Sequence, residues 1–476
     1  GQSRLQLFWS DSAGVTQKAG GDFLSASAGL LGPTLRAEVG DTVVVTFRNM
    51  ASGAHSIHPH GVAYGKQSEG AHYFDNTSQK EKEDDVVPPG GQHVYSWEVQ
   101  QDVSPQAGDP ACLTYSYVSH QHVVEDFNSG LIGALLVCKA GKTNPGRLVF
   151  LFGVFDEAAS RFRPGDYSSD GHVKYTINGY SKGALPVSVC AHSPVSLHLL
   201  GMSSEPEVFS VHVNGQVLQH NGHKVSSVGL VSGAGATAAM VAVHAGRWLL
   251  SSHVAKHMES ESRAGSRVPG FSEQTERTGT EWKYYIAAEE VTWDYAPDVH
   301  EHIDEDFKLQ YLTRSATRIG SKYKKAVYSL YTNESFSERL ETRKRRDELG
   351  ILGPVIRAQI RDVIVFKNMA SRPYSIYPHG LTIEKSEEGV NYPDGGNHSH
   401  GVLPGETHTY VWRVVEEDEP LPGDSRCLTR VYHSAVDTPR DIASGLIGPI
   451  LICKKTHQAQ TLQTLALAWL LLSDDG

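Results

Sequence analysis

The sequence lacks several features that would point to common functions. Its longest apolar run, residues 465–472 (LALAWLLL), is far shorter than the roughly 20 residues that a membrane-spanning helix needs. It has no basic excess, because 43 lysines and arginines stand against 54 acidic residues, for a net charge of −11. That balance argues against nucleic acid as the main partner.

Cysteine is scarce, but its spacing is regular. Cys112 and Cys138 are 26 residues apart, and so are Cys427 and Cys453, which leaves Cys190 over. Each pair lies in matching text, so we expect two disulfides formed in an oxidising compartment. Three glycosylation sequons point the same way: Asn76, Asn333 and Asn397. We therefore expect a secreted, extracellular glycoprotein.

The chain contains a long internal repeat. GLLGPTLRAEVGDTVVVTFRNMAS (29–52) matches GILGPVIRAQIRDVIVFKNMAS (350–371). A period above 300 residues is a domain repeat rather than a solenoid unit. With 46 glycines, 22 prolines and short β-branched runs, the sequence predicts an all-β protein of several packed units.

The first repeat carries an acidic loop at 66–91. Its carboxylates are Glu69, Asp75, Glu81, Glu83, Asp84 and Asp85. Calcium takes six to eight hard oxygen ligands, and the adjacent Asp84 and Asp85 repel each other unless a cation or solvent relieves them. A calcium site is the interpretation that we favour, and a solvated acidic loop is the alternative. A later acidic run, EEDE (416–419), is expected to be a solvated turn.

The stretch SIHPHG (56–61) places His58 and His60 two residues apart. On a strand, this spacing points both rings to the same side. Such a pair is a usual way to offer two imidazoles to one metal.

Longer phrases carry a family resemblance. GLLGPTLRAEVGD, YSYVSHQHVVEDFNSGLIGALLVCK, YYIAAEEVTWDYAP and DIASGLIGPILICKK resemble the A domains shared by ceruloplasmin, hephaestin and coagulation factors V and VIII. The resemblance covers about 29–455 and implies tandem cupredoxin-like Greek-key β-barrels, two for each A domain. The implied divisions are a first barrel of the first A domain (1–140), its second barrel (141–262), a linker (263–281), the first barrel of the second A domain (282–455) and the truncated start of a further barrel (456–476).

The resemblance also bears on copper. In the ferroxidase members a cysteine thiolate binds blue copper, and Ser252 occupies that position here, near His253 and His257. A serine does not supply the soft ligand. We therefore expect that this site does not bind copper and is a solvated loop with stray histidines.

A trinuclear copper cluster needs eight histidines, in pairs from two facing barrels. The first repeat supplies three at the matching positions and the second supplies two: His58, His60 and His120, then His379 and His433. Val118 in the first repeat and Tyr377 and Ala435 in the second stand at the remaining positions, so neither repeat has a full set, and the resemblance implies a partner barrel in a third A domain. One structural copper on His58, His60 and His120 is the tentative interpretation, and ordinary packed histidines are the alternative.

For function, the resemblance implies a non-enzymatic coagulation cofactor that holds a factor Xa-type protease and prothrombin in a prothrombinase-like complex. It implies calcium on the Lys66 carbonyl, Glu81, Asp84 and Asp85, with Glu69 and Asp75 in support. Membrane contact would be indirect, through domains of a longer chain. A multicopper ferroxidase is the first alternative. A truncated gene product with no independent activity is the second.

Overall fold

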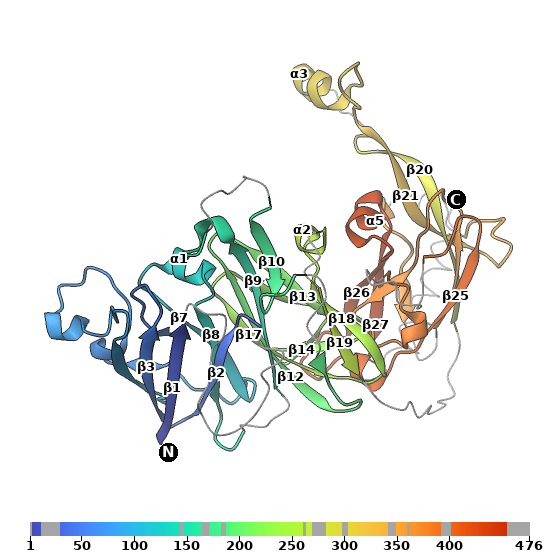
Figure 1. Cartoon of the computed structure of the whole chain (residues 1–476). Coiled ribbons are helices and arrows are strands. Elements are labelled where there is room, and N and C mark those ends of the chain that lie inside the picture. The colour runs from blue at the N-terminus through green and yellow to red at the C-terminus, as the bar shows by residue number, and fades with distance from the viewer. Residues whose placement is uncertain are drawn as a thin grey trace. The chain divides into compact units, whose positions relative to one another are not determined.

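The computed structural model describes residues 2–10, 29–142, 147–163, 171–181, 187–259, 263–268, 282–297, 303–340, 349–358, 362–391 and 401–454. The chain forms two compact units, Gly1–Phe271 and Ser272–Gly476 (Figure 1). The expectations for 456–476, for Asn397 and for most of the linker lie outside the described residues. In the described part, no helix is long and apolar enough to cross a membrane.

The first barrel of unit 1 consists of two four-stranded sheets. One has the order β1 (Gln2–Ser10), β3 (Thr42–Met50), β6 (Gln92–Glu98) and β5 (Ala63–Tyr64). The other has the order β2 (Gly32–Glu38), β8 (Ile132–Cys138), β7 (Cys112–Val118) and β4 (His58–Pro59). The helix α1 (Val123–Asn128) connects β7 to β8.

The alternation of side chains explains this arrangement. In β3, Val43, Val45 and Phe47 are fully buried, while the residues between them are less buried. A strand places successive side chains on opposite faces, so this pattern turns one face of β3 toward the core. That core also contains Trp97 and Tyr117.

The second barrel of unit 1 has a six-stranded and a five-stranded sheet. The first has the order β10 (Val173–Ile177), β9 (Arg147–Asp156), β12 (Pro194–Ser203), β17 (Gly235–Val241), β14 (Leu218–His220) and β15 (His223–Val225). The second has the order β11 (Val187–Ser188), β19 (Arg263–Val268), β18 (Gly246–Ser252), β13 (Val208–Val213) and β16 (Val228–Val231). The helix α2 (Ala255–Glu259) follows β18.

The strand β19 places the end of the second barrel later in the chain than the sequence predicts. Residues 263–268 were assigned to the linker, but they pair with β18 from Gly246↔Val268 to Ser251↔Arg263. Their sequence, RAGSRV, has little apolar alternation. Backbone pairing with β18 places residues 263–268 in the sheet. Such pairing does not depend on side-chain type, so the sequence does not predict it.

Unit 2 repeats the plan of the first barrel. One sheet has the order β21 (Lys322–Tyr331), β20 (Trp282–Asp294), β23 (Asp362–Asn368) and β25 (Thr407–Trp412). The other has the order β22 (Ile356–Ala358), β27 (Ile447–Cys453), β26 (Cys427–His433) and β24 (Tyr377–His379). Among its described residues are the α-helices α3 (Glu305–Phe307) and α5 (Thr438–Ser444) and a π-helical turn η5 (Lys308–Leu312).

The two repeats share their strand register as well as their strand order. His58 lies opposite Val118 across β4 and β7, and Tyr377 lies opposite His433 across β24 and β26. The disulfides Cys112–Cys138 and Cys427–Cys453 join β7 to β8 and β26 to β27 at equivalent positions. The all-β, tandem-barrel prediction is confirmed.

Candidate metal sites

The acidic loop of unit 1 contains its own cations. The ammonium of Lys66 lies 2.6 Å from Asp75 Oδ2 and also contacts the Glu69 carboxylate, while Lys82 Nζ lies 3.0 Å from Asp75 Oδ1. Hydrogen bonds from Lys66 and then Thr77 hold the pKa of Asp75 well below its usual range. Lys66 was expected to offer its carbonyl to calcium, whereas its side chain neutralises two of the candidate ligands.

Glu81 has a structural role in the same loop. The 3₁₀ helix η3 (Gln79–Lys82) begins at Ser78 with a capping box. Ser78 donates from its backbone N–H to Glu81 Oε2 at 2.9 Å and from its hydroxyl at 2.6 Å. These bonds lower the pKa of Glu81. The carboxylate is therefore already used to start the helix.

Asp84 and Asp85 differ from the other acids of the loop. Their exposed fractions are 0% and 1%. Asp84 Oδ2 accepts a hydrogen bond from the Gly70 N–H at 2.7 Å, but Asp84 Oδ1 and both carboxylate oxygens of Asp85 have no hydrogen-bond partner in the described structure. His72 Nδ1 lies 3.7 Å from Asp85 Oδ2. Burial and the charge of Asp84 raise the pKa of Asp85.

Unpaired buried carboxylates are costly, and a bound cation removes the cost. Three oxygens without hydrogen-bond partners on two adjacent residues suit a hard divalent ion such as Ca²⁺, with backbone carbonyls and water completing the shell. The donor set therefore fits calcium, with Asp84 and Asp85 as its anchors.

The acidic loop is tied to the histidine strand. Gly70 has φ +65°, and a Cβ there would lie 2.2 Å from the Ile57 carbonyl oxygen, so the backbones approach as closely as glycine permits. Ser56 donates from its hydroxyl to the Gly70 carbonyl at 2.6 Å. One residue earlier in the loop, the Glu69 carbonyl accepts from His58 Nδ1 at 2.7 Å.

Three histidines cluster beside this junction. The ring centroids of His58 and His60 are 5.2 Å apart, and those of His58 and His120 are 5.1 Å apart. Because the carbonyl of Glu69 can only accept, His58 carries its proton on Nδ1 and keeps a lone pair on Nε2. Burial lowers the pKa of His58 and of His60, and the neighbouring imidazoles add to the effect. The neutral form that binds metals is thus favoured.

The equivalent positions of unit 2 hold a different set. The rings of Tyr377 and His433 have centroids 5.4 Å apart, and those of His379 and His433 are 5.9 Å apart. His433 Nδ1 donates to the Ser434 carbonyl at 2.8 Å. Complete burial lowers the pKa of His433 to about 4. A phenol in place of one imidazole makes this a poorer copper site than the cluster of unit 1.

The serine at the thiolate position is buried, so the expectation of a solvated loop is wrong. The exposed fractions of Ser252 and His257 are 2% and 1%. Ser252 Oγ lies 2.9 Å from His257 Nδ1 and accepts from the Ser210 N–H at 3.1 Å. Glu207 Oε1 lies 3.4 Å from His257 Nε2. The strand β18 runs into the core up to Ser252, and α2 packs His257 back against it.

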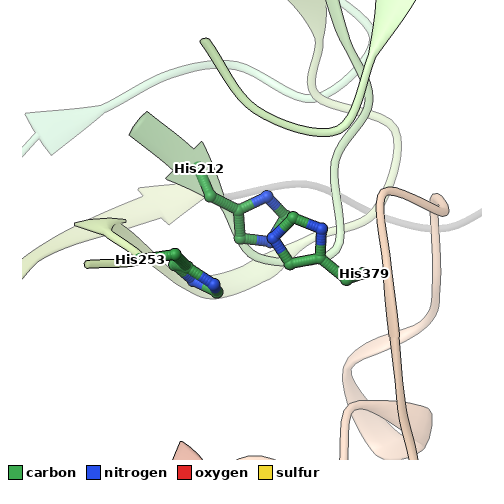
Figure 2. Close-up of side chains that lie close together, drawn as sticks. All are labelled: His212, His253 and His379. Carbon is green, nitrogen blue, oxygen red and sulfur yellow. The ribbon is translucent and has the colours of Figure 1, made fainter. Parts of the chain in front are cut away.

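Two further histidines lie close to each other at the neighbouring strands β13 and β18. The ring centroids of His212, on β13, and His253, directly after β18, are 4.6 Å apart in an edge-on arrangement (Figure 2). His212 Nδ1 donates to the Ser226 carbonyl at 2.7 Å. The register across β13 and β18 pairs Val211 with Ser252 and His212 with Ser251, so His212 and Ser252 point to opposite faces of the sheet. His257 is the imidazole that contacts Ser252, whose hydroxyl takes the place of the sulfur ligand.

The remaining predicted residues lie at the surface. Cys190 is exposed and is not in a disulfide, and Asn76 and Asn333 are exposed.

Asp418 is a residue that the sequence reasoning missed. The run 416–419 was expected to be a solvated turn, but Asp418 is fully buried and accepts from the backbone N–H groups of Thr382 at 2.8 Å and Val415 at 2.9 Å. Burial raises its pKa to about 7.

Comparison with known proteins gives a consistent result. Residues 15–142 match the family model described as multicopper oxidase. Human coagulation factor V is 48% identical over 455 residues, which cover 90% of this chain and 20% of the relative. The non-catalytic subunit of the venom prothrombin activator pseutarin-C from Pseudonaja textilis is 47% identical over 91% of this chain and 31% of the relative. Human coagulation factor VIII is 41% identical over 90% and 21%.

The barrels and the match at 15–142 define the class as cupredoxin-like proteins related to multicopper oxidases. Within that class, the chain belongs to the A-domain family that includes coagulation factors V and VIII. The chain spans about a fifth to a third of the length of the curated relatives described above.

Proposed function

We propose that this chain forms the A-domain part of a non-enzymatic coagulation cofactor that holds a factor Xa-type serine protease and prothrombin in a prothrombinase-like complex. The observation that carries the proposal is Ser252, because its hydroxyl closes a hydrogen bond with His257 where an oxidase needs a thiolate. A relative of similar identity is named as the non-catalytic subunit of a prothrombin activator, which supports the same role. The two disulfides support an extracellular location.

In this proposal calcium binds at Asp84 and Asp85 of unit 1. The ion stiffens the segment between Gly70 and Asp85, which is tied to the first barrel through Ser56 and His58. The rate gain of a cofactor comes from holding enzyme and substrate in a productive orientation, so a rigid docking surface is an advantage. A copper ion on His58, His60 and His120 would be structural.

A reconstituted assay tests the proposal. The chain, supplied with the C-terminal domains of a factor V, is added to factor Xa, prothrombin, calcium and anionic vesicles, and thrombin formation is followed. We expect kcat/KM to rise at least 100-fold over factor Xa alone, an expectation about the size of a proximity effect. No acceleration, or iron oxidation by the copper-loaded chain, would contradict the proposal and favour the ferroxidase alternative.

A further inference from the structure

Phe74 in unit 1 is an apolar side chain that is almost fully exposed to solvent. Phe74 lies in the loop between η2 (Lys66–Ser68) and η3, and 88% of its surface is exposed. Among the described residues the next most exposed large hydrophobic side chain is Ile319, at 63%. Exposed apolar residues are common, but a phenylalanine that is almost fully in water suggests a partner for its ring.

The residue two positions later is a candidate for modification. Asn76 begins the sequon Asn76-Thr77-Ser78, and its side chain is exposed. Its backbone has φ +58°, the left-handed region that asparagine adopts more readily than most residues. Two residues of chain span at most about 7 Å, so this length bounds the separation of the Cα atoms of Phe74 and Asn76.

The residue between them holds both in place. Asp75 accepts from the Thr77 N–H at 3.1 Å and the Thr77 hydroxyl at 2.7 Å. It also forms the ion pairs with Lys66 and Lys82 described above. The turn at 75–77 is therefore anchored to the loop, and Phe74 and Asn76, on either side of Asp75, are both exposed.

We propose that Phe74 is a platform for the first N-acetylglucosamine of a glycan on Asn76. The face of an aromatic ring carries partial negative charge and packs well on the C–H face of a pyranose, and this contact removes apolar surface of both from water. In the attachment step, Asn76 Nδ2 loses a proton and bonds to C1 of the sugar as the bond from C1 to a lipid-linked pyrophosphate breaks. Phe74 acts on the product, by holding the sugar against the loop.

A second sequon in unit 2 provides a matched control. Tyr331 precedes Asn333 by the same two positions, so both sequons have an aromatic residue at this offset. Tyr331 is only 6% exposed, it packs with Phe336, and its hydroxyl donates to Glu289. Its ring is committed to the core, so a glycan on Asn333 would lack the platform.

The test uses the full chain secreted from mammalian cells, with each glycan trimmed to one N-acetylglucosamine whose acetyl methyl carries ¹³C. We expect the methyl and ring signals of the sugar on Asn76, assigned with Asn76→Gln, to be shifted upfield by the ring current of Phe74. In Phe74→Ala they should return to the positions of an exposed sugar, while the Asn333 signals stay unchanged in both proteins.

Thermal unfolding gives a second readout. Asn76→Gln should lower the unfolding midpoint of unit 1 when Phe74 is present and leave it unchanged in Phe74→Ala, which is the coupling expected of two groups in contact. Peptide mass spectrometry that finds Asn76 unmodified would overturn the inference. Sugar signals that are identical with and without the Phe74 ring would overturn it as well.

Discussion

Calcium should stabilise unit 1 through Asp84 and Asp85, and mass action gives the size of the effect. An ion that binds only the folded state contributes about 2.7 kcal/mol when its concentration is 100 times its Kd. For a domain of 150–250 residues, each kcal/mol moves Tm by about 2–4 °C. We therefore expect calorimetry to show unit 1 unfolding about 5–10 °C higher in saturating calcium than in chelator.

The double variant Asp84→Asn/Asp85→Asn has a distinctive expected result. It should lose the calcium-dependent rise in Tm, because the anionic oxygens are gone. In chelator it should be at least as stable as the parent, because three carboxylate oxygens that lack partners are no longer charged and buried. The control is Glu83→Gln, which removes an exposed carboxylate from the same loop and should leave the rise intact.

The pH dependence provides a further check on the same site. Because the folded state raises the pKa of Asp85, the folded chain binds a proton more tightly than the unfolded chain does. Without calcium, the contribution of Asp85 to stability is present below a pH of about 4 and is lost as pH rises through its raised pKa. Calcium should reverse this trend. A rise in Tm that survives in the double variant would refute the assignment.

Three other outcomes follow from the structure. Copper(II) should give the parent chain no intense blue absorption, whereas Ser252→Cys should gain a thiolate–copper band, since the His257 imidazole already contacts that position. Because the pKa of His433 is lowered to about 4, unit 2 should lose up to about 3 kcal/mol of stability in urea titrations as pH falls from about 6.5 to 4, and His433→Asn should remove that loss. Replacing Cys112 and Cys138 by serine should cost about 3.5 kcal/mol in urea, the value for opening a 26-residue loop.

Much of the fold can be predicted from the sequence, because the internal repeat and the alternation of apolar residues are visible there. The repeat at 29–52 and 350–371 predicts two copies of one barrel, and the alternation of Val43, Val45 and Phe47 predicts which face is buried. The strand β19 was not predictable in this way. It joins the sheet through backbone hydrogen bonds with β18, and those bonds are independent of side-chain type.

The candidate sites show where sequence reasoning ends. An acidic run indicates a cation, but it does not tell which carboxylates a lysine or a helix cap will take. Here Lys66 takes Glu69 and Asp75, and Ser78 takes Glu81. The difference among these acids arises from burial and from the folding of the loop, as it does for Asp418, whose run of charges looks solvated in the sequence.

The two repeats also explain how metal ligands can disappear without loss of the barrel. At the junction beside the histidines, Ser119 donates to Asp126 Oδ2 at 2.6 Å, and Ser434 donates to Asp441 Oδ2 at 2.6 Å. These buried bonds connect strand to helix in each unit and do not involve an imidazole. Because the scaffold is braced by hydrogen bonds of its own, His58 can be replaced by a tyrosine at the equivalent position with the strand register kept. The barrel can therefore keep its fold while the residues at the metal-ligand positions change.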